Sequence, residues 1–127
     1  MFLKMSEINS IYPILSRLVN KKFPVRVSYK LSKLIAASEV ERKSYQEEFH
    51  KLLQVYAEFD EDGNLKTTDD KENIIIKTES LDEFQKEYID LLNLEVELPD
   101  VKFSIEDFEN CDFTPAEVYE LSKIIEE

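Results

Sequence analysis

The sequence predicts an α+β domain that is predominantly α, with one long helix, two or three shorter helices and a small antiparallel β element. Three observations lead to this prediction. Residues 25–59 contain neither glycine nor proline, which favours a long helix. Gly63 is the only glycine among 127 residues, whereas barrels and sandwiches need many tight turns. The segments 74–76 and 95–98 are β-branched or alternate in polarity, which favours short strands.

A first helix is expected near the N-terminus, with Ser6 as its cap. Pro13 lies within its apolar pattern, so it either kinks the helix or marks a later start. A connector at 20–23 then leads to Pro24, which suits the first turn of a second helix. The apolar face of the first helix is predicted from the helical spacing of Ile8, Ile11, Leu15 and Leu18.

Residues 24–59 predict one long helix, or two helices broken near the charged segment 38–44. A long helix with a polar middle often extends beyond its own core and offers a seam for self-association. The apolar faces on either side of the charged segment are Val27, Leu31, Leu34 and Ile35, and then Tyr45, Phe49, Leu52, Leu53 and Tyr56.

The middle of the chain predicts a turn, a strand and a helix. Residues 60–64 contain an Asp-Gly pair, which indicates a tight turn, and three isoleucines at 74–76 indicate a short β segment. Ser80 and Glu83 have the spacing of a capping box at the start of a helix. The buried stripe of that helix is predicted to be Leu81, Phe84, Tyr88, Leu91 and Leu92.

The C-terminal part predicts a hairpin and a last helix. Residues 95–98 read as a strand, and 101–103 are expected to return beside it after a turn at Pro99. Thr114 and Pro115 begin the last helix, with Glu117 completing a capping box. The predicted core comprises Leu31, Leu34, Phe49, Leu52, Leu53, Phe84, Tyr88, Leu91, Leu121 and Ile125.

Length and charge predict a single domain over residues 1–127 with a basic head and an acidic body. Residues 1–33 carry seven basic residues and one acidic residue, a net +6, and residues 34–127 carry nine basic and 27 acidic residues, a net −18. One cysteine, no signal peptide and no apolar run long enough for a membrane span indicate an intracellular protein. The acidic body disfavours nucleic acid as a partner.

The sequence offers little catalytic chemistry. With Gly63 at position six, Glu58, Asp60, Asp62 and Asp69 take calcium-loop positions, but the side-chain lengths fit poorly and an acidic hairpin turn is the preferred interpretation. His50 and Cys111 have no orienting partners in sequence, and catalytic acid pairs cannot be told from a solvated acidic surface. We therefore expect no enzyme, no cofactor and no metal.

Candidate partner-binding residues come from both charged regions. The basic ones are interleaved with aromatic residues, and the acidic ones could present carboxylates where a nucleic-acid-binding enzyme expects phosphates. The basic candidates are Lys21, Lys22, Arg26 and Lys30, and the acidic candidates are Glu47, Glu48, Asp60, Glu61 and Asp62.

Several segments, in their order along the chain, resemble a family of uncharacterised proteins from bacteriophages and prophages of Gram-positive bacteria. The resemblance covers most of residues 15–127 and is weakest over 1–14. It implies a phage or prophage origin and the host bacterial cytoplasm, but brings no activity and no functional residues. The segments are 22–33 (KFPVRVSYKLSK), 58–65 (EFDEDGNL), 84–87 (FQKE), 91–97 (LLNLEVE) and 113–117 (FTPAE).

The sequence thus supports the hypothesis of a phage-encoded, non-enzymatic protein that binds and modulates a host protein, for example as an acidic anti-defence inhibitor or nucleic-acid mimic. The alternative is a structural or tail or head assembly accessory that self-associates through the long helix. A small enzyme is the third hypothesis.

Overall fold

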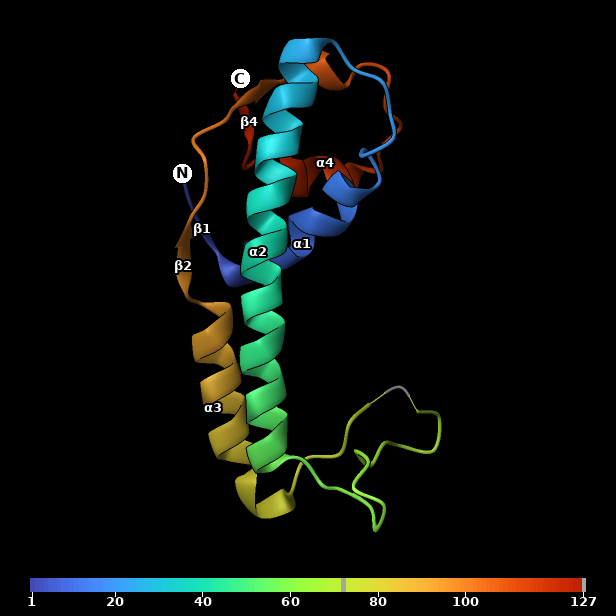
Figure 1. Ribbon diagram of the computed structural model, residues 1–127, viewed down its shortest axis with the longest axis vertical. Coiled ribbons are helices and arrows are strands. Elements are labelled where there is room, and N and C mark those ends of the chain that lie inside the picture. The colour runs from blue at the N-terminus through green and yellow to red at the C-terminus, as the bar shows by residue number, and fades with distance from the viewer. Residues whose placement is uncertain (72, 127) are drawn as a thin grey trace. The chain divides into compact units, whose positions relative to one another are not determined.

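The computed structural model describes residues 1–71 and 73–126 and confirms a predominantly α fold with one long helix and a small antiparallel sheet (Figure 1). Its backbone forms two compact units, each described separately below. Unit 1 comprises Met1–Lys43 and Glu95–Glu127, and unit 2 comprises Ser44–Leu94. The elements in chain order are β1 (Phe2–Lys4), α1 (Met5–Ser16), α2 (Val25–Tyr56), η1 (Thr78–Ser80), α3 (Leu81–Leu92), β2 (Glu95–Glu97), β3 (Phe103–Ser104), η2 (Ile105–Phe108), α4 (Pro115–Leu121) and β4 (Ile125–Glu126).

The long segment forms one helix, because α2 runs without interruption from Val25 to Tyr56 (Figure 1). Its charged middle is built from Glu, Arg and Lys, which are good helix formers, so polarity there does not break the backbone pattern. Residues of α2 up to Lys43 belong to unit 1 and the remainder to unit 2.

Unit 1 contains two small sheets, and both use a segment near an end of the sequence. β1 pairs antiparallel with β2, as Figure 1 shows, and β3 pairs parallel with β4. The predicted hairpin within 95–103 is therefore wrong. Strands of two or three residues are marginal alone, and pairing with β1 and β4 also buries Leu3 and Phe103 in the core.

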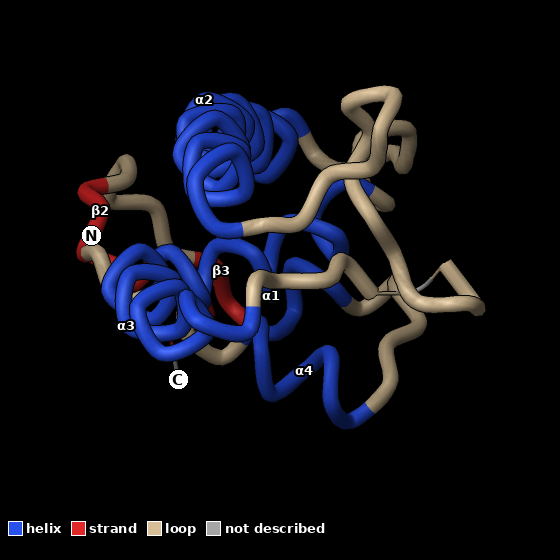
Figure 2. The backbone as a smooth tube through the Cα atoms, turned by 90° about the horizontal axis from the view of Figure 1, so that it is seen from below, coloured by secondary structure: helices blue, strands red, loops and turns tan. Residues whose placement is uncertain are grey.

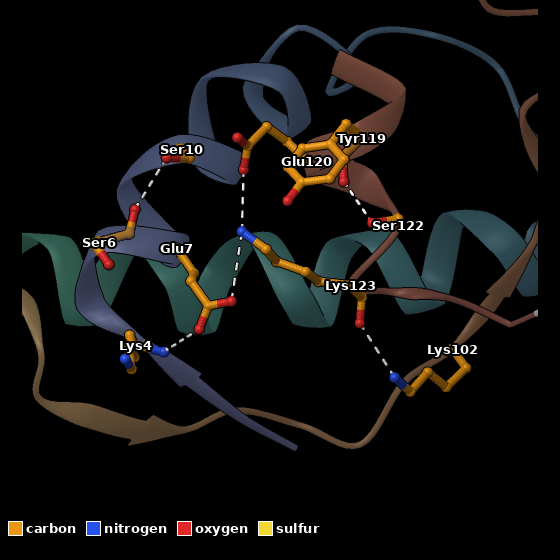
Figure 3. Close-up of polar contacts among 9 residues, drawn as sticks. All are labelled: Lys4, Ser6, Glu7, Ser10, Lys102, Tyr119, Glu120, Ser122 and Lys123. Atoms are coloured by element: carbon orange, nitrogen blue, oxygen red, sulfur yellow. Dashed lines mark hydrogen bonds and ion pairs between the residues drawn. The ribbon is translucent and has the colours of Figure 1, made fainter. Parts of the chain in front are cut away.

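The first helix confirms the predicted apolar face but not the predicted cap. Ile8, Ile11, Leu15 and Leu18 are all buried. The helix begins at Met5, before Ser6, because β1 leads directly into it and the backbone N–H of Lys4 donates to the carboxylate of Glu7 at 2.9 Å (Figure 3). Pro13 lies inside this helix.

The last helix begins as predicted. The Thr114 N–H donates to Glu117 Oε1 at 2.9 Å, and the Glu117 N–H donates to Thr114 Oγ1 at 3.2 Å, so the capping box is complete. Of the final isoleucines, Ile124 is fully buried whereas the predicted core residue Ile125 is half-buried. The two differ because successive residues at a strand point to opposite sides.

Unit 2 is formed by the α2 residues from Ser44 onward, α3, and the irregular segment 57–77, drawn mostly as loop in Figure 2. The predicted β segment at 74–76 forms isolated bridges, Ile74 with Thr67 and Ile76 with Ala57. Three backbone bonds close a ring within this segment: Glu58 N–H to Ile75 O, Ile75 N–H to Lys66 O, and Lys66 N–H to Glu58 O, each 2.9 Å.

The helix start in unit 2 differs from the prediction. Ser80 ends a short 3-10 helix and makes no capping hydrogen bond through its side chain, so the capping box with Glu83 is wrong. A helical turn already precedes the residue, which leaves it a conformation unlike that of an extended N-cap.

The predicted core residues are buried to different extents. Leu31, Leu34, Leu53, Leu91 and Leu121 are buried, as predicted. The predicted core residues Phe49, Leu52, Phe84 and Tyr88 are only half-buried, and all four lie in unit 2. Two helices leave part of each of these side chains open to solvent where no further layer covers them.

Candidate partner-binding surfaces

Charge is divided unevenly between the two units. Unit 2 carries 14 acidic residues and five lysines, a net −9, whereas the residues of unit 1 carry 14 acidic and 11 basic residues, a net −3. The division also separates the predicted binding residues. All four basic candidates belong to unit 1, and all five acidic candidates belong to unit 2.

Two of the basic candidates are engaged within unit 1. The Lys21 ammonium donates to the backbone carbonyl of Asn110. The Lys30 ammonium donates to the carbonyl of Lys102 at 2.9 Å and lies 5.8 Å from the ring centre of Phe103. The basic head therefore closes partly on the acidic C-terminal part of its own unit.

The other two basic candidates, Lys22 and Arg26, are exposed. Arg17, another basic residue of the head, forms an ion pair with Glu117 of α4. Lys123 makes a further contact within unit 1, with Glu120 at 3.1 Å and Glu7 at 3.4 Å (Figure 3). Burial alone would lower the pKa of Lys123, but its hydrogen bonds to the two carboxylates and their negative charges raise it.

The acidic candidates lie on α2 and on the turn that follows it. Glu47 and Glu48 are exposed on the helix, and Glu48 pairs with Lys51 at 3.0 Å. In the turn, Asp60 Oδ1 accepts the backbone N–H groups of Asp62 and Asn64, both at 2.9 Å. Asp60 is therefore a turn residue, as in other Asx-turns. The neighbouring Glu61 and Asp62 are exposed.

The structure does not assemble the calcium loop. Asp60 uses one carboxylate oxygen within its own turn, and Gly63 has a φ of 81° that closes this turn. Among residues 1–71 and 73–126, no three His, Cys, Asp or Glu side chains are grouped so that they could hold a metal ion. The other two candidate calcium ligands, Glu58 and Asp69, lie in the acidic loop segment of unit 2.

An acidic face on α3 was missed by the sequence analysis. Asp82, Glu83, Glu87 and Asp90 are all exposed on this helix. Glu83 and Glu87 also act on Tyr56 of α2: desolvation raises the tyrosine pKa, and a hydrogen bond to Glu87 with the charges of Glu87 and Glu83 raises it further. The spacing of 83, 87 and 90 at helical intervals was the signal that could have identified this face.

Five aromatic side chains hold the two helices of unit 2 together. Ring centres lie 6.1 Å apart for Tyr45 and Phe49, 5.4 Å for Phe49 and Tyr88, and 5.8 Å for Tyr88 and Phe84. Tyr56 completes the cluster with an edge contact to Phe84 at 6.2 Å. All five rings are only half-buried, so this cluster supports the acidic helices and also borders their surface.

The groups considered for catalysis lie in different units. His50 of unit 2 contacts Gln54 one helical turn along α2, at 3.1 Å. Cys111 of unit 1 is a half-buried free thiol.

A polar contact also joins α1 to α2 within unit 1. Tyr12 donates a hydrogen bond to Glu39 at 3.0 Å, which raises the pKa of the tyrosine. The Arg42 guanidinium lies 4.5 Å from the centre of the Tyr12 ring.

No protein-family model, curated protein or solved structure matches the chain. The resemblance to phage and prophage proteins therefore stays a prediction. No helix in the described part of the chain combines the length and apolar character that crossing a bilayer requires.

Proposed function

We propose that the chain is a phage- or prophage-encoded, non-enzymatic factor that modulates a host protein by binding its basic surface through the acidic surface of unit 2. The observation that carries this proposal is the charge of unit 2. Its five lysines can neutralise at most five of its 14 carboxylates, so unit 2 itself leaves at least nine without compensation.

Exposure makes these carboxylates accessible to a partner. The α3 acids and the α2 acids Glu47 and Glu48 are exposed, as are Glu61 and Asp62 in the turn. Repulsion among like charges destabilises a compact unit, and a basic surface would relieve it on binding. The charges that lower the stability of the free protein would therefore increase its affinity for the partner.

The spacing of the α3 acids favours a partner that ordinarily binds nucleic acid. Glu83, Glu87 and Asp90 are separated by about 6 and 4.5 Å along the helix axis, given a rise of 1.5 Å per residue. Phosphates recur about every 3.4 Å along the axis on one DNA strand, so these carboxylates lie one to two phosphate steps apart. We infer a mimic of a short stretch of phosphate backbone, which suits an anti-defence inhibitor.

Matched charge variants test the proposal. E83Q/E87Q/D90N removes three charges from α3 with side chains of nearly the same size, and E95Q/E97Q/D100N removes three exposed charges from unit 1. Tagged proteins are used for capture from lysate of a Gram-positive host at about 50 and 300 mM NaCl, because screening weakens exposed charge contacts.

At low salt, the wild-type chain and the unit 1 variant should both retain a host protein, whereas the α3 variant should not. Soluble duplex DNA should release that host protein from the wild-type chain. Purified host protein should then bind the wild-type chain directly and lose activity on its nucleic acid. Equal binding by the α3 variant would exclude the acidic surface as the contact.

An assembly accessory is the second candidate function. It is favoured by apolar side chains that α2 leaves in solvent, since Val25, Tyr29 and Val40 are 86 %, 66 % and 64 % exposed. Capture of phage head or tail proteins, with no salt-sensitive host protein, would favour this role.

A further inference from the structure

Unit 1 contains an apolar groove between η2, α4 and β4. Two adjoining cavities of about 440 and 550 Å³ share the lining residues Ile105, Glu106, Val118 and Ile125, so they form one continuous depression, which we call the unit 1 groove. Ile105 is 62 % exposed and Val118 is 40 % exposed, while Phe108 and Leu121 are buried at its floor.

The rim of this groove has one sign of charge. Its charged residues are Glu106, Glu109 and Glu126, and no lysine or arginine is found among the described residues that line it. An apolar depression with an acidic rim fits a protrusion that combines an apolar centre with basic flanks. This groove belongs to unit 1, whereas the proposed function rests on the acidic surface of unit 2.

The same unit presents such a protrusion at the start of α2, which we call the α2 patch. Val25 and Tyr29 lie four residues apart on one helical face and are among the most exposed apolar side chains. Lys22, Arg26 and Lys33 are exposed beside them, and the Lys33 ammonium lies 5.4 Å from the centre of the Tyr29 ring.

The patch does not fill the groove of its own chain, because Val25 and Ile105 both remain largely in solvent. We propose that the occupant of the groove is the α2 patch of a second copy. In a two-fold dimer each copy gives its patch to the other's groove, so two identical contacts form at once. Val25 and Tyr29 provide the apolar anchors, and Arg26 and Lys33 face the carboxylates of the rim.

The net charge of −12 does not prevent this contact at physiological salt. Unit 1 carries only −3 of that charge, and the remainder is in unit 2. At about 0.15 M salt, charges further apart than about 8 Å are largely screened, whereas charges in contact are screened less. Association should therefore be measured near that salt concentration.

Sedimentation velocity and light scattering on the full chain, over about 5–500 μM, test the proposal at salt concentrations near 0.15 M. The wild-type chain should shift from monomer to dimer as concentration rises. R26E/K33E in the patch and E106K/E109K in the groove should each raise the dimer dissociation constant about tenfold or more. The combined fourfold variant should regain dimerisation, because the reversed charges again match. K43E/K66E, with the same charge change outside the patch, should dimerise like the wild-type chain.

A second variant separates association from folding. V25S/Y29S changes two side chains that are largely in solvent, so its circular dichroism should equal that of the wild-type chain while dimerisation is lost. A wild-type chain that stays monomeric over the whole range would overturn the proposal. So would a dimer that both charge-reversal variants leave unchanged, or a fourfold variant no better than either of its parents.

Discussion

The two units of this protein differ in how their segments are connected along the chain, in burial and in charge. Unit 1 gathers segments from both ends of the sequence around fully buried residues such as Ile8, Leu15, Leu34 and Ile124. Unit 2 is a local excursion of the chain between residues 44 and 94, and its aromatic rings are only half-buried. Its net charge is also three times that of unit 1, at −9 against −3.

This contrast indicates where stability and binding reside. Close packing around buried apolar side chains supplies most of the stability of a small domain. A half-open unit with a large excess of one charge has less to stabilise it and more to offer a charged partner. We therefore expect unit 1 to be the more stable unit. We expect the stability of unit 2 to respond to salt and to partners.

The largest expected effect compares two leucines on the same helix. Leu34→Ala removes a fully buried side chain from unit 1 and should lower the free energy of unfolding by about 3 kcal/mol. Leu52→Ala removes a half-buried side chain from unit 2 and should cost about 1 kcal/mol. Urea unfolding followed by circular dichroism measures both. Equal losses would contradict the contrast in packing between the units.

Lys123 tests how unit 1 holds its C-terminal part to α1. Lys123→Met removes the contacts to Glu7 and Glu120 and should cost about 1 kcal/mol at pH 7. Because the folded-state pKa is raised, the contribution is complete below the ordinary value of 10.5 and is lost as pH rises above it. Denaturant unfolding at pH 7 and in steps above pH 10 checks this. A difference between the two proteins that stays constant over this range would exclude the charge as the cause.

Two helix starts provide a matched pair. Thr114→Ala removes an observed cap from α4 in unit 1 and should cost about 1 kcal/mol. Ser80→Ala precedes α3 in unit 2, where the side chain makes no capping bond, and should change stability by less than about 0.5 kcal/mol. Thermal unfolding of both variants measures the difference. A larger loss from Ser80→Ala would show that its cap forms in solution.

The smallest expected effect is the response of unit 2 to salt. Raising NaCl from about 20 to 300 mM screens repulsion among its acids and should slow hydrogen exchange of α3 amides about twofold. The amides of α1 in unit 1 should change little, because that unit is closer to neutral. Mass spectrometry of peptides from each helix provides the measurement. An equal response in both helices would mean that the charge difference does not control local stability.

Local sequence determined the helices and most of their inner faces. The stripe of α1 and the Thr114 capping box follow from patterns within a few turns of backbone, where neighbouring residues decide the conformation. The sequence also predicted a helical segment at α2 but left open whether it was one helix or two, and the structure shows one. The acidic character of the candidate binding residues was likewise evident from composition.

Only the tertiary structure decided the strand pairing, the grouping of charges and the groove of unit 1. β2 pairs with the N-terminal strand instead of 101–103, since short strands gain most of their stability from the core they cover. Lys21 and Lys30 were candidates for partner binding in sequence, yet both bind carbonyl groups of residues distant along the chain. Such contacts depend on which segments are brought together by the fold. The periodicity of residues within one segment does not determine which other segment will pack against it.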